Sequence, residues 1–143
     1  MSFISSSENP VELGLPHRDP FLFIDRVLRV VPGPEAWGEK SFSPDHPIFQ
    51  GHFPGKPIVP GVILTEALAQ LSGIAGAGVE GRTFLLSAIR SMKFPSAAQP
   101  GELISLHVRR TGDLDGLLHF EVHATSKDQT VAKGHVILNE VKA

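Results

Sequence analysis

The apolar segment from Gly61 to about Ala77 constrains the fold more than any other feature of the sequence. Its apolar side chains fall on all sides of a helical wheel: Val62, Ile63, Leu64, Ala67, Leu68, Ala69, Leu71, Ile74 and Ala75. A helix that is apolar all round has to be buried. The sequence therefore predicts one long central helix that the rest of the chain encloses.

The segments around this helix have the composition and alternation of strands. Apolar and polar residues alternate in the later ones, which is typical of antiparallel strands with one wet face. The predicted strands are residues 21–31, 36–42, 83–94, 103–109 and 118–124. With five to six strands and one buried helix, we expect an α+β domain in which a curved antiparallel sheet wraps the helix.

Length and composition narrow the class of protein. The 143 residues fit one domain, and we expect a flexible tail at residues 1–10 and a single domain over 11–143. The net charge of -2 argues against a nucleic-acid binder. The absence of cysteine excludes thiolate nucleophiles and cysteine-based metal sites, and it fits a reducing compartment. Without a signal sequence or a long apolar run, the protein is expected to be cytoplasmic, with no membrane association.

Two polar residues, Glu66 and Gln70, interrupt the apolar helix. Their i, i+4 spacing places both side chains on one face. A carboxylate there is costly to bury unless it is paired, protonated or open to a cavity. Burial also favours the protonated form that a general acid needs. Glu66 is therefore a candidate acid supported by Gln70; the alternative is a structural ion pair with a distant arginine.

Residues 43–61 are dense in Pro, Gly and His, which predicts a long loop without regular structure. Such a loop in a compact domain is usually functional. His52 lies in this loop, between Gly51 and Phe53-Pro54-Gly55, and histidine titrates near neutrality as a general base should. A lone loop histidine is more often an ordinary surface residue, so the hypothesis depends on its combination with Glu66.

The start of the predicted helix supplies a third element. Its first backbone N–H groups, at Gly61, Val62 and Ile63, lack partners within a helix and can bind an oxyanion. A base, an acid and oxyanion donors together suit removal of a proton beside a thioester carbonyl.

Other uses of the histidines are weaker. Asp45, His46 and His52 lack a further ligand at a usual zinc spacing, so no metal is expected, and no cofactor. The remaining histidines are scattered, and those on strands are expected on solvated faces: His17, His107, His119, His123 and His135.

Three motifs resemble the (3R)-hydroxyacyl-[acyl carrier protein] dehydratases of type II fatty-acid synthesis. The first is Leu-Pro-His-Arg-Asp-Pro-Phe-Leu at 15–22, with Asp-Arg at 25–26. The second is Phe-Gln-Gly-His-Phe-Pro-Gly-Lys-Pro-Ile-Val-Pro-Gly-Val at 49–62, and the third is Glu-Ala-Leu-Ala-Gln at 66–70. The resemblance extends over about residues 13–138, and the middle motif is long and specific.

This resemblance implies the hotdog fold, a homodimer with two active sites at its interface, and in many members a trimer of dimers. It implies dehydration of (3R)-3-hydroxyacyl chains on acyl carrier protein to trans-2-enoyl thioesters. His52 of one subunit would remove the α-proton, and Glu66 of the other would protonate the departing hydroxyl. The N–H of Gly61, with that of Val62, would polarise the thioester carbonyl, and Gln70 would support the acid.

Residues 83–102 depart from the family pattern, since Arg90 follows Ile89 where an acidic residue is usual. A specialised pathway such as polyene or polyketide assembly therefore stays open. Two other functions are alternatives. A hotdog acyl-thioesterase is disfavoured by the His-Phe-Pro-Gly loop, and a non-catalytic acyl-binding or scaffolding subunit is disfavoured by the presence of both His52 and Glu66.

Overall fold

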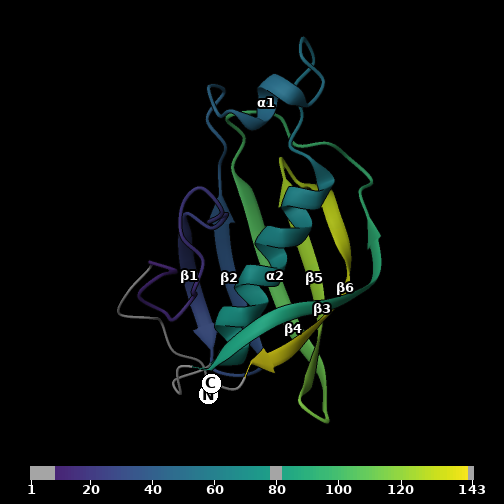
Figure 1. Cartoon of the computed structure of the whole chain (residues 1–143). Helices are drawn as coiled ribbons and strands as arrows, with labels where there is room; N and C mark the ends of the chain where they lie inside the picture. The colour runs from purple at the N-terminus through teal and green to yellow at the C-terminus, as the bar shows by residue number, and fades with distance from the viewer. Residues whose placement is uncertain (1–8, 78–81, 142–143) are drawn as a thin grey trace.

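The computed structural model describes residues 9–77 and 82–141, and it consists of one long helix lying across a six-stranded antiparallel sheet (Figure 1). The strand order is β1-β2-β4-β5-β6-β3. The elements are β1 (Arg26–Val31), β2 (Glu35–Lys40), α1 (Ile48–Gly51), α2 (Gly61–Ala77), β3 (Thr83–Lys93), β4 (Ile104–Leu114), β5 (Leu117–Ser126) and β6 (Gln129–Val141). The predicted sheet wrapped around one helix is confirmed. Of the predicted tail, only Asn9 and Pro10 belong to the described residues.

Helix α2 has the predicted bounds, and most of its side chains are buried. Its two hydroxyl groups bond to the preceding turn, so they leave no unsatisfied donor in the core: Thr65 donates to Gly61 O (3.0 Å) and Ser72 to Leu68 O (2.9 Å). Gly76 allows a close approach to the sheet, because a Cβ there would lie 2.8 Å from Leu118 Cδ1. No helix within residues 9–77 and 82–141 is long and apolar enough to span a membrane.

The central strands alternate as predicted, with one face of β4 and β5 buried against α2: Ile104, Leu106, Val108, Leu118, Phe120 and Val122. These strands are longer than expected because their connections are tight two-residue turns. Positive φ angles at Asp115 and Gly116, and at Lys127 and Asp128, allow each strand to return directly alongside its neighbour.

Two segments differ from the sequence-based expectation. β1 begins at Arg26 instead of Phe21, because the backbone at Phe21 and Phe23 bonds to the side chain of Gln70 instead of to a strand. The loop predicted to lack regular structure contains the single helical turn α1. Proline is tolerated at the start of a helix, and Pro47 precedes this one with φ at -56°.

A glycine determines how closely the edge strand β3 approaches β6. Gly134 pairs with Met92, and a Cβ at Gly134 would overlap the carbonyl oxygen of Ser91 and lie 2.5 Å from the Met92 sulfur. We expect Gly134→Ala to lower the free energy of unfolding by about 1–3 kcal/mol, since the overlapping atom is backbone. Urea denaturation measures this. In the control, Gly112→Ala, the nearest atom to the new Cβ is 3.7 Å away. Equal midpoints for the two variants would contradict the prediction.

Candidate active site

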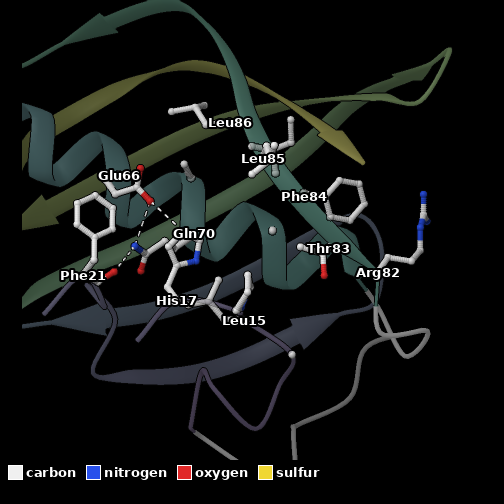
Figure 2. Close-up of a pocket in the computed structure, with 15 residues that line it drawn as sticks. Leu15, His17, Phe21, Glu66, Gln70, Arg82, Thr83, Phe84, Leu85 and Leu86 are labelled. Atoms are coloured by element: carbon white, nitrogen blue, oxygen red, sulfur yellow. Dashed lines mark hydrogen bonds and ion pairs between the residues drawn. The ribbon is translucent and has the colours of Figure 1, made fainter. Parts of the chain in front are cut away.

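A cavity of about 200 Å³ lies between one face of α2, the start of β3 and the segment before β1 (Figure 2). Glu66 and Gln70 line it from the helix, Leu85 and Leu86 from the strand, and His17 from the N-terminal segment. Apart from a few polar groups, the walls are apolar. The cavity therefore has the character of a ligand site, in which apolar walls surround a few placed polar atoms.

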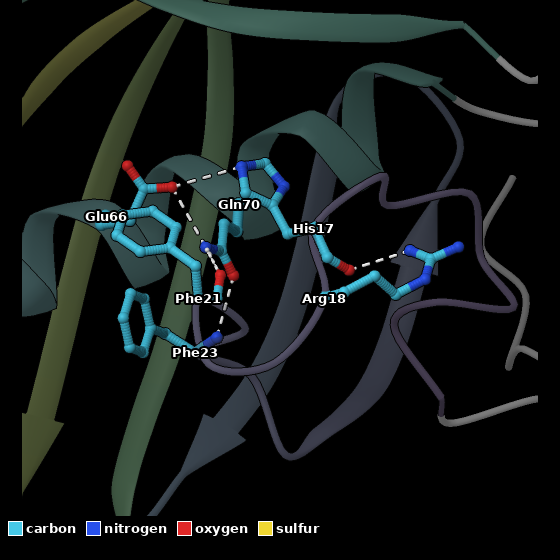
Figure 3. A network of polar contacts seen from close by, with 6 residues as sticks. All are labelled: His17, Arg18, Phe21, Phe23, Glu66 and Gln70. Carbon is cyan, nitrogen blue, oxygen red and sulfur yellow. Dashed lines mark hydrogen bonds and ion pairs between the residues drawn. The ribbon is translucent and has the colours of Figure 1, made fainter. Parts of the chain in front are cut away.

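The buried amide of Gln70 fixes the position of Glu66 (Figure 3). Gln70 Nε2 donates to Glu66 Oε2 (3.1 Å) and to Phe21 O (3.0 Å), while Gln70 Oε1 accepts from the N–H of Phe23 (3.0 Å). Gln70 is only 2% exposed and its bond to the N–H of Phe23 is buried, so together these bonds determine which way the amide faces. The contacts of the carboxylate use Oε2, which leaves Oε1 as the oxygen that can carry a transferable proton.

His17 is the residue that sequence reasoning missed. Its Nε2 lies 3.5 Å from Glu66 Oε2, and its Nδ1 is buried with no hydrogen-bond partner among the described residues. The ring also stacks on Phe21, with centroids 6.2 Å apart. Its position in the first motif, close to Phe21, is the one feature of the sequence that could have drawn attention to it. No spacing rule predicts that residue 17 contacts a helix face about fifty residues later.

Loss of the Gln70 amide should weaken the fold as well as release Glu66. We expect Gln70→Met to lower the free energy of unfolding by about 1–3 kcal/mol, because the buried N–H of Phe23 and the partly buried C=O of Phe21 lose their partner. Urea denaturation is the measurement. The control is Thr111→Val, at an exposed strand position, which should change the free energy of unfolding by less than about 0.5 kcal/mol. An unchanged midpoint for Gln70→Met would contradict this reading of the network.

His52 lies just after α1, and its ring orientation is defined by one bond. His52 Nδ1 is 3.0 Å from the carbonyl oxygen of Ile58. A carbonyl only accepts, so Nδ1 is the donor in this contact. With Nδ1 engaged by the loop, Nε2 is the ring nitrogen that is a candidate general base.

The start of α2 lies against the same cavity as His52, which is lined by Gly61, Leu64 and Phe94 as well. The ring of Phe94 packs directly over Gly61, where a Cβ would lie 3.0 Å from two ring carbons, so a larger residue would require the ring to shift. The N–H of Ile63 donates to Pro60 O (3.0 Å), which removes it from the three predicted oxyanion donors. For Gly61 and Val62, no hydrogen bond to an acceptor is found within the described residues.

Within one chain, the two halves of the candidate site lie in different cavities. His52 and Gly61 line one, and Glu66 and Gln70 line the other. The sequence places His52 and Glu66 near each other along the chain, but their side chains share no cavity in a single subunit.

The other histidines have structural partners. His46 Nδ1 accepts from the N–H of Ile48 (3.2 Å) and its ring packs against Phe42, so it belongs to the loop. Within residues 9–77 and 82–141, no group of three His, Cys, Asp or Glu side chains is arranged to hold a metal ion.

The strand histidines lie on the outer face of the sheet, but only His123 is exposed as predicted. His107 Nε2 pairs with Glu35 (2.6 Å), and His119 Nδ1 lies 3.2 Å from His135 Nε2. Burial lowers the pKa of His135 below its ordinary value, and the positive charges of His119 and Arg90 act in the same direction. These residues lie apart from both cavities.

Comparison with known proteins agrees with this geometry. A family model described as the FabA-like domain matches residues 15–135. The 3-hydroxyacyl-[acyl-carrier-protein] dehydratase FabZ of Ruminiclostridium cellulolyticum is 38% identical over 132 residues, which cover 90% of this chain and 93% of that protein. The protein of the same name from Acetivibrio thermocellus is 40% identical over 125 residues, covering 85% and 86%.

Among solved structures, the dehydratase heterocomplex ApeI:P from Xenorhabdus doucetiae is similar in fold. Its TM-score is 0.74 at 16% identity, over 94% of this chain and 92% of that one. The predicted hotdog fold is confirmed. With a family model matched over most of its length and relatives near 40% identity, the chain belongs to the FabA-like domain family.

Proposed function

We propose that this protein removes water from (3R)-3-hydroxyacyl chains on acyl carrier protein and releases trans-2-enoyl thioesters, in fatty-acid synthesis or a related acyl-chain pathway. The observation that carries the proposal is the Glu66 carboxyl group, held by the buried Gln70 amide at the side of an apolar cavity. The two FabZ relatives are named for this reaction. The protein is thus proposed to be a hydro-lyase that uses its own side chains.

In the proposed reaction, His52 Nε2 takes the proton from the carbon next to the thioester carbonyl. The N–H groups of Gly61 and Val62 stabilise the negative charge that develops on the carbonyl oxygen. The electrons of the broken C–H bond form the new double bond, and the C3–O bond breaks. Glu66 gives its proton to the departing hydroxyl, which leaves as water. Gln70 and His17 hold the carboxyl group through Oε2, so that Oε1 faces the substrate.

A homodimer follows from this assignment, because each half of the site lies in a different cavity. The chain has a suitable surface: β3 pairs only with β6 in the described sheet, so its other edge is available to a partner. Leu85 and Ile89 on this strand are 60% and 52% exposed, and Val62 at the start of α2 is 75% exposed. Unpaired, apolar edge strands are usually covered in native proteins. We propose a second copy as the cover, with a trimer of dimers as a further assembly.

The test is incubation of the protein with 3-hydroxyacyl carrier protein while the absorbance of the conjugated enoyl thioester is followed. The proposal expects the absorbance to rise without release of free thiol. Free thiol without enoyl product would favour a thioesterase. Binding without either product would favour a non-catalytic acyl-binding subunit and would contradict the proposal.

A further inference from the structure

Phe53, the residue after His52, has a strained backbone conformation. Its φ is 54°, in the left-handed region where a bulky side chain is an outlier. The residue before a proline also prefers an extended backbone, with φ near about -120°, and Phe53 precedes Pro54. Apart from glycine, the other described residues with positive φ lie in the two hairpin turns, which favour it: Asp115, Lys127 and Asp128. Phe53 lies in neither hairpin, so its conformation needs another explanation.

The turn that follows Phe53 does not impose this conformation. The N–H of Lys56 donates to Phe53 O (2.9 Å), which closes a turn over residues 53–56. The demands of such a turn fall on its two central residues, here Pro54 with its fixed φ and Gly55 with φ at 95°. Burial gives no compensation within the chain either, because Phe53 is 60% exposed. A strained backbone and an exposed phenyl ring thus coincide at one residue.

The left-handed backbone brings the Phe53 ring beside the ring of His52. In an extended backbone, consecutive side chains point to opposite sides. Here the two ring centroids are only 4.6 Å apart, with the planes at 59° to each other. Both residues line the cavity at the start of α2. The imidazole therefore has two supports, the Ile58 carbonyl 3.0 Å from Nδ1 and the phenyl ring of its neighbour.

We infer that Phe53 is a positioning residue, whose strained backbone holds its ring against His52 and so fixes the direction of Nε2. This inference rests on the proposed dehydratase function, in which Nε2 is the base. The bond at Nδ1 fixes one point of the imidazole, and the phenyl ring limits its tilt about that point. A displacement of about 1 Å at a reacting group can cost about 100-fold in rate. The strain at residue 53 is thus maintained for activity at the expense of stability.

The experiment compares three substitutions of Phe53 by urea denaturation and by the kinetics of enoyl formation. Phe53→Asn removes the ring and suits a left-handed backbone, so its urea midpoint should rise. Its kcat should fall about 10- to 100-fold with little change in KM. Phe53→Leu keeps an apolar side chain without the flat ring, and should lose activity without a gain in midpoint. Phe53→Tyr keeps the ring and should recover most of the wild-type kcat.

The matched control is Lys127→Asn, at a left-handed position of the turn between β5 and β6 (φ 51°). It should raise the urea midpoint in the same way and leave kcat unchanged, because the turn contacts neither cavity.

NMR of ¹⁵N-labelled histidine gives a readout that does not depend on catalysis. The His52 signal is assigned from its absence in His52→Ala and recorded at a pH at which the ring is neutral. In the wild type and in Phe53→Tyr, the hydrogen should lie mainly on Nδ1, which donates to Ile58 O. In Phe53→Asn and Phe53→Leu, a mixture of the two tautomers is expected, because the ring is no longer held against the loop.

The outcomes separate this inference from the proposed function. If the wild type gives no enoyl product, the dehydratase function is wrong, and the tautomer signals still decide whether Phe53 orients His52. If the wild type is active but Phe53→Asn keeps the wild-type kcat or the wild-type tautomer, the positioning role is overturned. A raised KM with unchanged kcat would make Phe53 a substrate contact instead. A lowered urea midpoint or a dissociated oligomer in Phe53→Asn would show a structural residue, and would equally overturn the inference.

Discussion

Replacement of His52 by alanine is expected to lower kcat for enoyl formation by at least about 100-fold, because a positioned general base contributes about 100- to 10,000-fold. Glu66→Gln should have an effect of the same order. Glutamine keeps an oxygen that accepts from Gln70, so the network of the buried amide can survive, but it has no proton to transfer to the hydroxyl. Steady-state kinetics over a substrate series measure both losses.

Folding has to be separated from chemistry in these variants. His123→Ala is the matched control, since His123 is an exposed histidine on the outer face whose ring bonds to the Thr130 hydroxyl (2.8 Å). His52→Ala, Glu66→Gln and His123→Ala should all retain the wild-type sedimentation profile. Their free energies of unfolding should differ from the wild-type value by less than about 0.5 kcal/mol. His52→Ala removes the loop bond to Ile58 and the ring contact with Phe53, and added imidazole should restore part of its activity. Retention of more than about a tenth of the wild-type kcat in either variant would contradict the assigned roles.

The helix and the central strands follow from local pattern, and the sequence predicted them well. An all-apolar helix can only be buried, and the alternation around Leu106 and Phe120 specifies which strand face is covered. The start of β1 could not be predicted in this way. Phe21 and Phe23 have the composition of a strand, but their backbone partner is a glutamine side chain about fifty residues later in the chain. Patterns along a chain do not record such contacts.

In the candidate site, too, local sequence pattern predicted some residues and missed others. Glu66 and Gln70 were found because a carboxyl group and an amide are unusual in an apolar helix, and the structure places them in direct contact. His17 had no such signal, because its contact with Glu66 depends on how the N-terminal segment crosses α2. His52 and Glu66 line different cavities of one chain, so their proposed meeting across two subunits involves a second copy, which no local pattern records. Short spacing in the sequence does not imply that two residues share one cavity.

Because each half of the proposed site lies in its own cavity, two inactive variants should restore activity to each other. A 1:1 mixture of His52→Ala and Glu66→Gln subunits, refolded together or co-expressed, should recover about one quarter of the wild-type specific activity. Half of the dimers are then mixed, and each mixed dimer has one site with an intact His52 from one subunit and an intact Glu66 from its partner. Enoyl formation by the mixture is compared with that by each variant alone.

The reciprocal mixture is the control and gives an independent number. When wild-type chains are mixed 1:1 with chains carrying both substitutions, every site of a mixed dimer lacks one of the two residues. Activity should then fall to about one quarter of the wild-type value, whereas sites contained within single chains would leave about one half. The two experiments respond in opposite ways to the alternative: if each chain held a complete site, the first mixture would stay inactive and the second would keep half its activity. Agreement of both at about one quarter would place the reaction between two subunits.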